Sequence, residues 1–209
     1  MLNKTYVHKF ATGLLIANLL AGCGAPSAAD ATAVPSASAQ PTAAVQANVE
    51  YADMSGYSTY NDTTTYHFIN ATLDHVKEMR DNGASFVFYM GYDTCPFCNA
   101  VMPVLNAEAS KYGLDVYYVD ALAAVDDGSL DRHQDDLLEQ FKDQFQPDED
   151  GSYAVQVPIT AFYVDGKLDS FHVGFVDGYD TSAGSATTEE ATEFLSAIDP
   201  GFRAVLGIS

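Results

Sequence analysis

Two cysteines, Cys95 and Cys98, are separated by two residues and follow a short apolar run, 86–90, that breaks at Gly91. A Cys-x-x-Cys pair can carry out thiol–disulfide exchange, form a structural disulfide or supply half of a zinc site. The aromatic run is typical of a buried strand, and the residues after it have helical spacing. We therefore expect Cys95 at a helix N-terminus, where unpaired backbone N–H groups and the helix dipole favour the nucleophilic thiolate.

Several prolines and glycines elsewhere in the chain follow the two cysteines in an order and at sequence spacings that can be compared with known folds. Pro103 lies five residues after Cys98, inside the expected helix, and a distant apolar run begins at Pro158 and reaches a turn at Gly166, with Gly174 beyond it. In order and spacing these residues resemble the thioredoxin family. That family has a proline in its motif helix and a cis-proline that opens a strand ending in a turn glycine.

The resemblance covers about residues 65–198. Pro96 and Phe97, between the cysteines, are most similar to glutaredoxins and to thioredoxin-like accessory proteins associated with bacteriocin export. Two positions depart from thioredoxin itself. Thr94 stands where thioredoxin has a tryptophan, and Tyr89 stands where it has a buried acid.

The resemblance implies an α/β fold, a thioredoxin-like three-layer sandwich with a mixed central sheet between helices. It also implies that the Cys95 thiolate forms a mixed disulfide with the substrate and that Cys98 resolves it, with no cofactor beyond the redox-active disulfide. Pro158, in cis, would face the cysteines and leave the Val157 backbone free to pair with an extended substrate. Pro96 and Phe97 complete the expected substrate-binding residues, Phe97 as an exposed apolar contact.

The N-terminus carries a secretion pattern. Lys4 and Lys9 precede an apolar segment, 10–20, that is shorter than the ~20 residues of a membrane-spanning helix. It ends in Leu-Ala-Gly-Cys, which resembles bacterial lipoprotein signals. We therefore predict a signal peptide over 1–22 and lipid on Cys23, which would anchor the protein to the cell membrane on its extracytoplasmic side. An ordinary signal peptide cut elsewhere is the alternative.

Composition divides the rest of the chain. Residues 24–48 are almost entirely Ala, Ser, Pro, Thr, Gln and Val, which predicts a disordered tether behind the lipidated Cys23. Residues 49–64 are transitional, and 65–209 form the predicted thioredoxin-like domain. With Cys23 lipidated, only Cys95 and Cys98 remain as thiols, and export places them where disulfides persist, so redox chemistry is favoured over a metal.

The expected elements follow one another in the order β-α-β-α-β-α-β-β-α. Strands are expected over 63–69, 86–90, 114–119, 159–164 and 168–174, and helices over 73–80, 96–111 and 188–198. Asp165-Gly166 predicts a hairpin turn, and Asp199-Pro200-Gly201 predicts the end of the last helix. The stretch 121–156 is longer than this layout needs and predicts an enlarged helical insertion. No role is assigned to it or to the long loop 177–186.

The net charge and the positions of the histidines bear on whether the protein binds nucleic acid or a metal ion. The chain has 29 acidic and 9 basic residues and a net charge of −20, so nucleic acid is an unfavourable partner. The histidines are scattered, so we expect no metal site.

Three functions remain open. The first is a membrane-tethered thiol–disulfide oxidoreductase acting on exported proteins with cysteines or disulfides, with a possible membrane redox partner. The second is an accessory or peptide-binding module whose disulfide is structural. The third, a metal carrier, is the weakest.

Overall fold

The computed structural model describes residues 49–182 and 185–208. The predicted signal peptide (1–22), the lipidation site Cys23 and the tether (24–48) lie outside the described residues. Within the described ranges, no helix has the length and apolar character that crossing a membrane requires.

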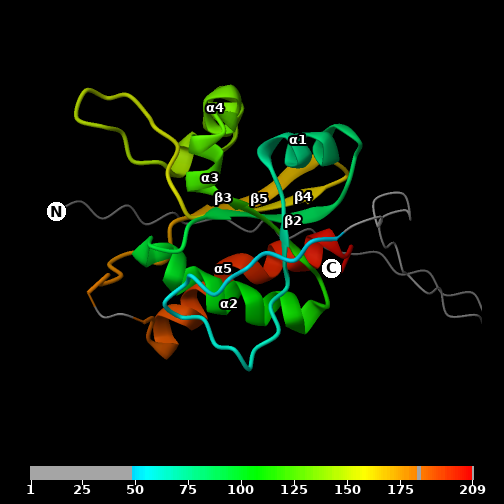
Figure 1. Cartoon of the computed structure of the whole chain (residues 1–209), viewed down its shortest axis with the longest axis vertical. Coiled ribbons are helices and arrows are strands. Elements are labelled where there is room, and N and C mark those ends of the chain that lie inside the picture. Colours follow the sequence, from blue (N-terminus) through cyan, green and yellow to red (C-terminus); the bar gives the residue numbers. More distant parts are fainter. Residues whose placement is uncertain (1–48, 183–184, 209) are drawn as a thin grey trace, which may run out of the picture. The chain divides into compact units, whose positions relative to one another are not determined.

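A five-stranded mixed sheet forms the middle layer, with strand order β1-β3-β2-β4-β5 (Figure 1). β3 pairs in parallel with both β1 and β2, β4 runs antiparallel to β2, and β5 runs antiparallel to β4. The strands are β1 (Phe68–Asn70), β2 (Phe86–Gly91), β3 (Val116–Asp120), β4 (Ile159–Val164) and β5 (Lys167–Val173).

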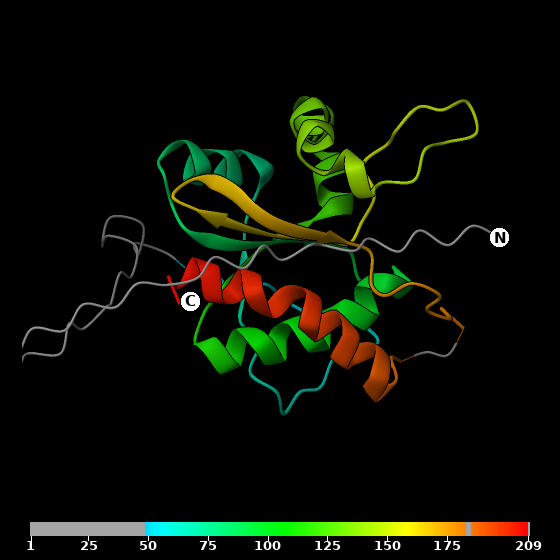
Figure 2. The ribbon, with the colours of Figure 1, turned by 180° about the vertical axis from the view of Figure 1, so that it is seen from behind.

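Helices cover both faces of this sheet. One outer layer holds α1 (Leu73–Asp81), α3 (Ala121–Asp126) and α4 (Ser129–Phe141), and the other holds α2 (Pro96–Tyr112) and α5 (Thr188–Val205). Figures 1 and 2 show the two layers on opposite sides of the strands. The predicted α/β thioredoxin-like three-layer sandwich is confirmed.

The central strand β2 delivers the cysteines. All six of its residues are buried, as its apolar run predicts. Val87 and Tyr89 lie in the core cluster shared with α2 and α5, while Phe88 and Met90 lie in the cluster shared with α1 and α4. Alternate residues of a strand face opposite sides of the sheet, so this one strand supplies both cores.

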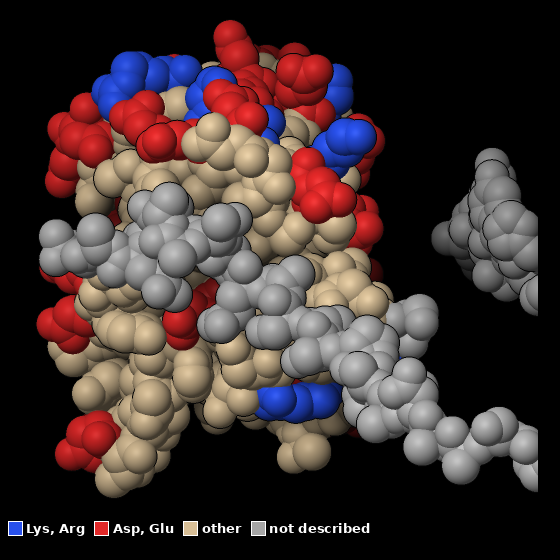
Figure 3. Space-filling view, turned by 90° about the vertical axis from the view of Figure 1, so that its right-hand side faces the viewer, with Lys and Arg blue, Asp and Glu red and all other residues tan. Residues whose placement is uncertain are grey.

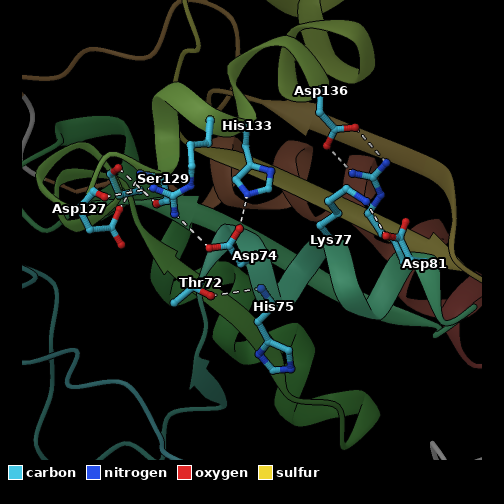
Figure 4. Close-up of polar contacts among 12 residues, drawn as sticks. Thr72, Asp74, His75, Lys77, Asp81, Asp127, Ser129, His133 and Asp136 are labelled. Carbon is cyan, nitrogen blue, oxygen red and sulfur yellow. Dashed lines mark hydrogen bonds and ion pairs between the residues drawn. The ribbon is translucent and has the colours of Figure 1, made fainter.

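The predicted helical insertion is confirmed over 121–144, where it forms α3, α4 and the short 3-10 helix η1 (Lys142–Gln144), whereas residues 145–156 form no helix. Charged contacts hold α4 against α1. The guanidinium of Arg80 donates two hydrogen bonds to Asp136, at 2.5 and 3.2 Å. Asp74 of α1 points toward His133 of α4 (Figure 4), with 2.7 Å between carboxylate oxygen and ring nitrogen. The insertion is therefore docked on the domain.

The insertion also protects a sheet edge. The side-chain amide of Gln144 accepts the backbone N–H of Val173 at 2.9 Å and donates to the carbonyl of Phe171 at 3.2 Å. These are the contacts that a further strand would make with β5. Covering the polar groups of an edge strand discourages pairing with another chain.

The last helix is longer than predicted. α5 runs to Val205, so the expected stop at Asp199-Pro200-Gly201 is wrong. Tertiary packing overrides the local signal, because the fully buried Phe202 stacks on Tyr112 at 5.7 Å and meets the edge of Phe162 at 5.2 Å. Gly201 lies so close to the Phe162 ring that a Cβ there would clash.

The first strand is shorter than predicted. β1 covers only 68–70, because residues before it leave the sheet. A turn precedes β1, in which the side-chain oxygen of Asn61 accepts the backbone N–H of Thr63 at 3.0 Å. The backbone N–H of His67 donates to the side chain of Asn106 on α2 rather than to a neighbouring strand.

Residues 49–60, for which sequence assigns no role, pack on the domain. Tyr51 forms an antiparallel bridge with Ile69, and the Ala52 N–H donates to the Phe68 carbonyl at 2.8 Å. Met54 and Tyr57 are buried in the same core cluster as the two cysteines. This segment therefore belongs to the folded unit.

Charged side chains are unevenly distributed. Figure 3 shows acidic and basic side chains intermingled at the end of the domain that carries α1 and α4 in Figure 1, with acidic ones in excess. Charged side chains at this density keep the surface well solvated.

Candidate functional site

Cys95 is the N-cap of α2, as predicted. Its backbone is extended (φ −77°, ψ 121°), Pro96 occupies the first helical turn, and the Cys98 N–H donates to Cys95 Sγ at 3.1 Å. The two cysteines are joined by a disulfide, with 5.1 Å between their Cα atoms. A sulfur that accepts a helix N-terminal N–H is placed where a thiolate is electrostatically favoured.

Both sulfurs are shielded from solvent. Cys98 has no exposed surface and Cys95 only 4%. The Phe97 ring, itself 37% exposed, meets the edge of Tyr179 at 5.7 Å, and Tyr179 packs on Phe175 at 5.1 Å. The loop after β5 therefore lies against the first turn of α2, where Figures 1 and 2 draw the two side by side. Tyr179 had no distinguishing signal in the sequence.

Pro158 lies beside the disulfide. The Val157–Pro158 peptide bond is cis, as the resemblance implies. The β2–β4 register pairs Met90 with Ile159, so Pro158 adjoins Gly91, and a Cβ at Gly91 would be 3.1 Å from Cys98 Sγ. The backbone N–H and carbonyl of Val157 make no hydrogen bond to another residue in the described part of the chain. The predicted residues therefore come together at the end of β2.

A group of buried hydroxyls lies under the disulfide. The Tyr57 and Tyr118 hydroxyls are 3.3 Å apart, and the Tyr118 hydroxyl donates to Asp120 Oδ2 at 3.3 Å. The Tyr89 hydroxyl donates to the Cys98 carbonyl at 3.3 Å, and a Cβ at Gly91 would be 2.7 Å from it. We call Tyr57, Tyr89, Tyr118 and Asp120 the hydroxyl cluster. Sequence reasoning identified only Tyr89, as a departure from thioredoxin.

Burial controls the ionisation of this cluster. It raises the pKa of Tyr57, Tyr89 and Tyr118 far above that of a free phenol, and the Asp120 carboxylate adds to the effect on Tyr57 and Tyr118. The three hydroxyls are therefore neutral at all ordinary pH values. A neutral phenol can both donate and accept a hydrogen bond.

The side chain of Asn99 hydrogen-bonds both to the segment 49–60 and to the backbone around Cys95. Its amide donates to the carbonyls of Asp93 and Cys95, at 2.5 and 2.9 Å. Its oxygen accepts the backbone N–H and the hydroxyl of Ser58, at 2.6 and 2.8 Å. Asn99 was missed, although a polar residue between Cys98 and an apolar helical stretch is a usable signal.

The four predicted binding residues differ in accessibility. Pro96 and Phe97 are exposed, Val157 is half-buried and Pro158 is buried. Across the described ranges 49–182 and 185–208, no group of three or more His, Cys, Asp or Glu side chains is placed to hold a metal ion. His172, on β5, points a ring nitrogen at the carbonyl of Phe175.

The solved structures similar to this chain include several thioredoxins. Oxidised thioredoxin O2 from Arabidopsis thaliana shares 18% identity over 56% of this chain and 88% of its own, with a TM-score of 0.35. Thioredoxin NaTrxh from Nicotiana alata shares 17% over 66% and 98%, with a TM-score of 0.36. An uncharacterised thioredoxin-like protein from Clostridium perfringens shares 17% over 64% and 82%, with a TM-score of 0.34. No protein-family model and no curated protein matches the chain.

Proposed function

We propose that this protein is a membrane-tethered, extracytoplasmic thiol–disulfide oxidoreductase that exchanges disulfides with exported proteins through Cys95 and Cys98. The observation that carries the proposal is the disulfide at the N-terminus of α2, with Cys95 Sγ accepting a helix N–H. The thiolate is the form in which a cysteine attacks a disulfide or leaves one.

The exchange proceeds in two steps. In the reduced protein, the Cys95 thiolate attacks a substrate disulfide, forms a mixed disulfide and releases one substrate sulfur as a thiolate. Cys98 then loses its proton and attacks Cys95 Sγ, which forms the intramolecular disulfide and releases the second substrate sulfur. The substrate gains two electrons and the protein loses them. The reverse sequence oxidises a substrate dithiol.

Substrate chains would bind along the residues around the pair. The unpaired backbone of Val157 can hydrogen-bond an extended peptide in the manner of an added strand. The exposed ring of Phe97 offers an apolar contact beside it. Pro158 and Pro96 complete this binding surface.

Localisation rests on the N-terminal sequence. Lipid on Cys23 would anchor the protein outside the cytoplasm, and the segment 24–48 would tether the domain to the membrane. A redox partner in the membrane would renew the active form of the Cys95–Cys98 pair. Nucleic acid is not proposed as a partner, since 29 acidic residues face 9 basic ones.

A second candidate function is an accessory or peptide-binding module of the bacteriocin-export type. The observation in its favour is the 4% exposure of Cys95, which suits a structural disulfide better than an open nucleophile. Pro96 and Phe97 between the cysteines fit the same subfamily. In this function the peptide surface at Val157 binds its partner while the disulfide stays closed.

The reduction potential of the Cys95–Cys98 pair separates the two functions. The full chain is equilibrated in dithiothreitol or glutathione buffers and its free thiols are alkylated. Near ~−120 mV the protein would donate disulfides, and near ~−270 mV it would reduce them. A pair that stays oxidised well below ~−300 mV would refute the oxidoreductase function and favour the binding module.

Matched variants test the roles of the cysteines. Cys95→Ser abolishes exchange with a disulfide substrate, because the attacking sulfur is lost. Cys98→Ser accumulates the mixed disulfide, which a non-reducing gel detects, because the resolving sulfur is lost. A Cys95→Ser variant that keeps full exchange activity would contradict the mechanism.

A further inference from the structure

We propose that Gln156 positions the Val157 backbone for substrate peptides, through two hydrogen bonds that its side chain makes with the backbone of Gln146. The inference rests on the proposed oxidoreductase function and deepens it. It adds a positioning residue outside the Cys95–Cys98 pair. It also makes extended peptide disulfides, rather than small disulfides, the substrate class that the site favours.

The backbone just before β4 lacks the support that a sheet gives. Residues 151–158 form no helix or strand, and the Val157 backbone makes no hydrogen bond in the described ranges. An unsupported backbone has many conformations, and a peptide that pairs with it must select one of them at a cost in affinity. A peptide-binding backbone at this place therefore needs support from side chains.

The Gln156 side chain supplies that support. Its Oε1 accepts the backbone N–H of Gln146 at 3.0 Å, and its Nε2 donates to the Gln146 carbonyl at 2.5 Å. One side-chain amide thus satisfies both backbone groups of Gln146, as a paired strand residue would. We call this pair of residues the glutamine clamp.

The clamp ties the segment to a fixed part of the core. Phe145, the neighbour of Gln146, is only 4% exposed and lies in the core cluster on the α1–α4 side of the sheet. On the other side of Val157, Pro158 is buried, and its carbonyl accepts the backbone N–H of Gly174 at 2.8 Å. The Val157 backbone is therefore held from both ends, while its own N–H and carbonyl stay free for a substrate.

Between the two halves of the clamp the chain forms an exposed loop. Residues 146–154 are exposed, and Figures 1 and 2 show the loop extending away from the sheet. Its tip is closed by a hydrogen bond from the Asp148 N–H to the Ser152 carbonyl at 2.8 Å. Across the described ranges, the bonds of the Gln156 side chain are the only hydrogen bonds that residues 153–157 make. Loss of the clamp therefore frees the segment that leads into Val157.

The clamp acts on binding and leaves the chemistry to the cysteines. Neither glutamine makes a hydrogen bond to Cys95 or Cys98 among the described residues. A substrate with a peptide chain can pair with Val157, whereas a small disulfide has no chain to pair. Removal of the clamp should therefore weaken the binding of peptides and leave the reaction of small disulfides unchanged.

Two probes with the same leaving group separate binding from chemistry. One is a short synthetic peptide whose single cysteine is joined to thionitrobenzoate, and the other is N-acetylcysteine amide joined to the same group. The reduced full chain carries Cys23→Ser, so that only the pair reacts, and is mixed with an excess of each probe. The Cys95 thiolate bonds to the cysteine sulfur of the probe and expels the coloured thionitrobenzoate thiolate. Cys98 then loses its proton to solvent, bonds to Cys95 Sγ and releases the probe as a thiolate.

Gln156→Ala should raise the peptide concentration at half-maximal rate roughly tenfold, because the peptide must then order the backbone of about one more residue. The limiting rate should not change, since the reacting sulfurs are untouched. With the N-acetylcysteine amide probe, the variant should react as fast as the parent. Gln156→Glu keeps the size of the side chain but loses the amide donor, and it should weaken peptide binding in the same direction.

Gln144→Ala is the matched control. That side chain also accepts one backbone N–H and donates to one carbonyl, at Val173 and Phe171, but on β5 rather than before Pro158. Its loss should leave the half-saturating concentration of both probes unchanged. Tyr153→Ala removes a 42% exposed side chain from the loop itself, and it should also change neither value.

An unchanged half-saturating peptide concentration in Gln156→Ala would overturn the positioning role. An equal rise in Gln144→Ala or Tyr153→Ala would overturn it as well, because the effect would then come from general loosening or from the loop surface. A parent protein that releases thionitrobenzoate from neither probe would instead overturn the oxidoreductase function, and the role of the clamp with it.

Discussion

Phe202→Ala tests whether the last helix continues past its internal proline. If α5 ended at Ile198, Phe202 would lie in an exposed tail and its loss would change stability by less than ~0.5 kcal/mol. In the structure its side chain has no exposed surface and contacts the rings of Tyr112 and Phe162. The loss of unfolding free energy expected for Phe202→Ala therefore differs by several kcal/mol between a helix that ends at Ile198 and one that continues to Val205.

The size of the effect follows from these contacts. Truncating a fully buried phenylalanine costs about 3–5 kcal/mol, which includes the transfer of the ring and the cavity left behind. The stacked and edge-on aromatic pairs, worth about 0.5–1.5 kcal/mol each beyond area burial, favour the upper half of that range. Phe202→Leu keeps most of the volume and should cost about 1–2 kcal/mol.

Urea denaturation under non-reducing conditions measures the change, with the midpoint read by circular dichroism. Leu206→Ala is the matched control, since Leu206 caps the same helix and is 39% exposed, and it should shift stability by less than ~0.5 kcal/mol. The denaturant slope should stay constant. A Phe202→Ala loss below ~1 kcal/mol, equal to that of the control, would refute the packing described for the end of α5.

Further substitutions probe the site and its surroundings. Tyr179→Ala should raise the alkylation rate of Cys95 in the reduced protein several-fold, because it removes a ring packed beside the first turn of α2; an unchanged rate would show that this loop does not shield the sulfur. Asn99→Ala should cost about 2–3 kcal/mol, measured by urea denaturation, because the four hydrogen bonds that its side chain makes to Ser58, Asp93 and Cys95 are lost. The Lys111 ammonium holds the pKa of Asp199 well below its usual range. Its contribution to stability is therefore complete above about pH 4 and lost as pH falls further, and Asp199→Asn should weaken the dependence of the unfolding midpoint on acid in that window.

Several strands, turns and helix ends could be predicted from residues that are close together in the sequence. The apolar run of β2 predicts a strand buried on both faces, since no polar residue interrupts it. Asp165-Gly166 predicts a tight hairpin, and both residues have positive φ, 51° and 75°. Thr187 and Glu190 predict a capping box, and both of its hydrogen bonds form. Each of these depends on residues within about four positions of one another.

The rest of the site could not be predicted because its contacts join distant segments. Tyr57 and Tyr118 are 61 positions apart, and nothing near either of them indicates a shared hydrogen bond. Asn99 bonds to Ser58 across 41 positions, in a segment without regular structure. Tyr179 reaches Phe97 from a loop whose length gives no sign of where it lies.

The sequence by itself determined the order of the five strands, the position of Cys95 at the start of a helix and the chemistry that two cysteines at this spacing can perform. These properties follow from hydrophobic period, capping and turn residues, which act over one or two turns of chain. Only the tertiary structure decided that α5 continues through Pro200, that Tyr179 packs beside the disulfide and that four hydroxyl and carboxyl groups meet beneath Cys98. Burial and packing free energies decide these features, and they depend on which distant residues share the same core.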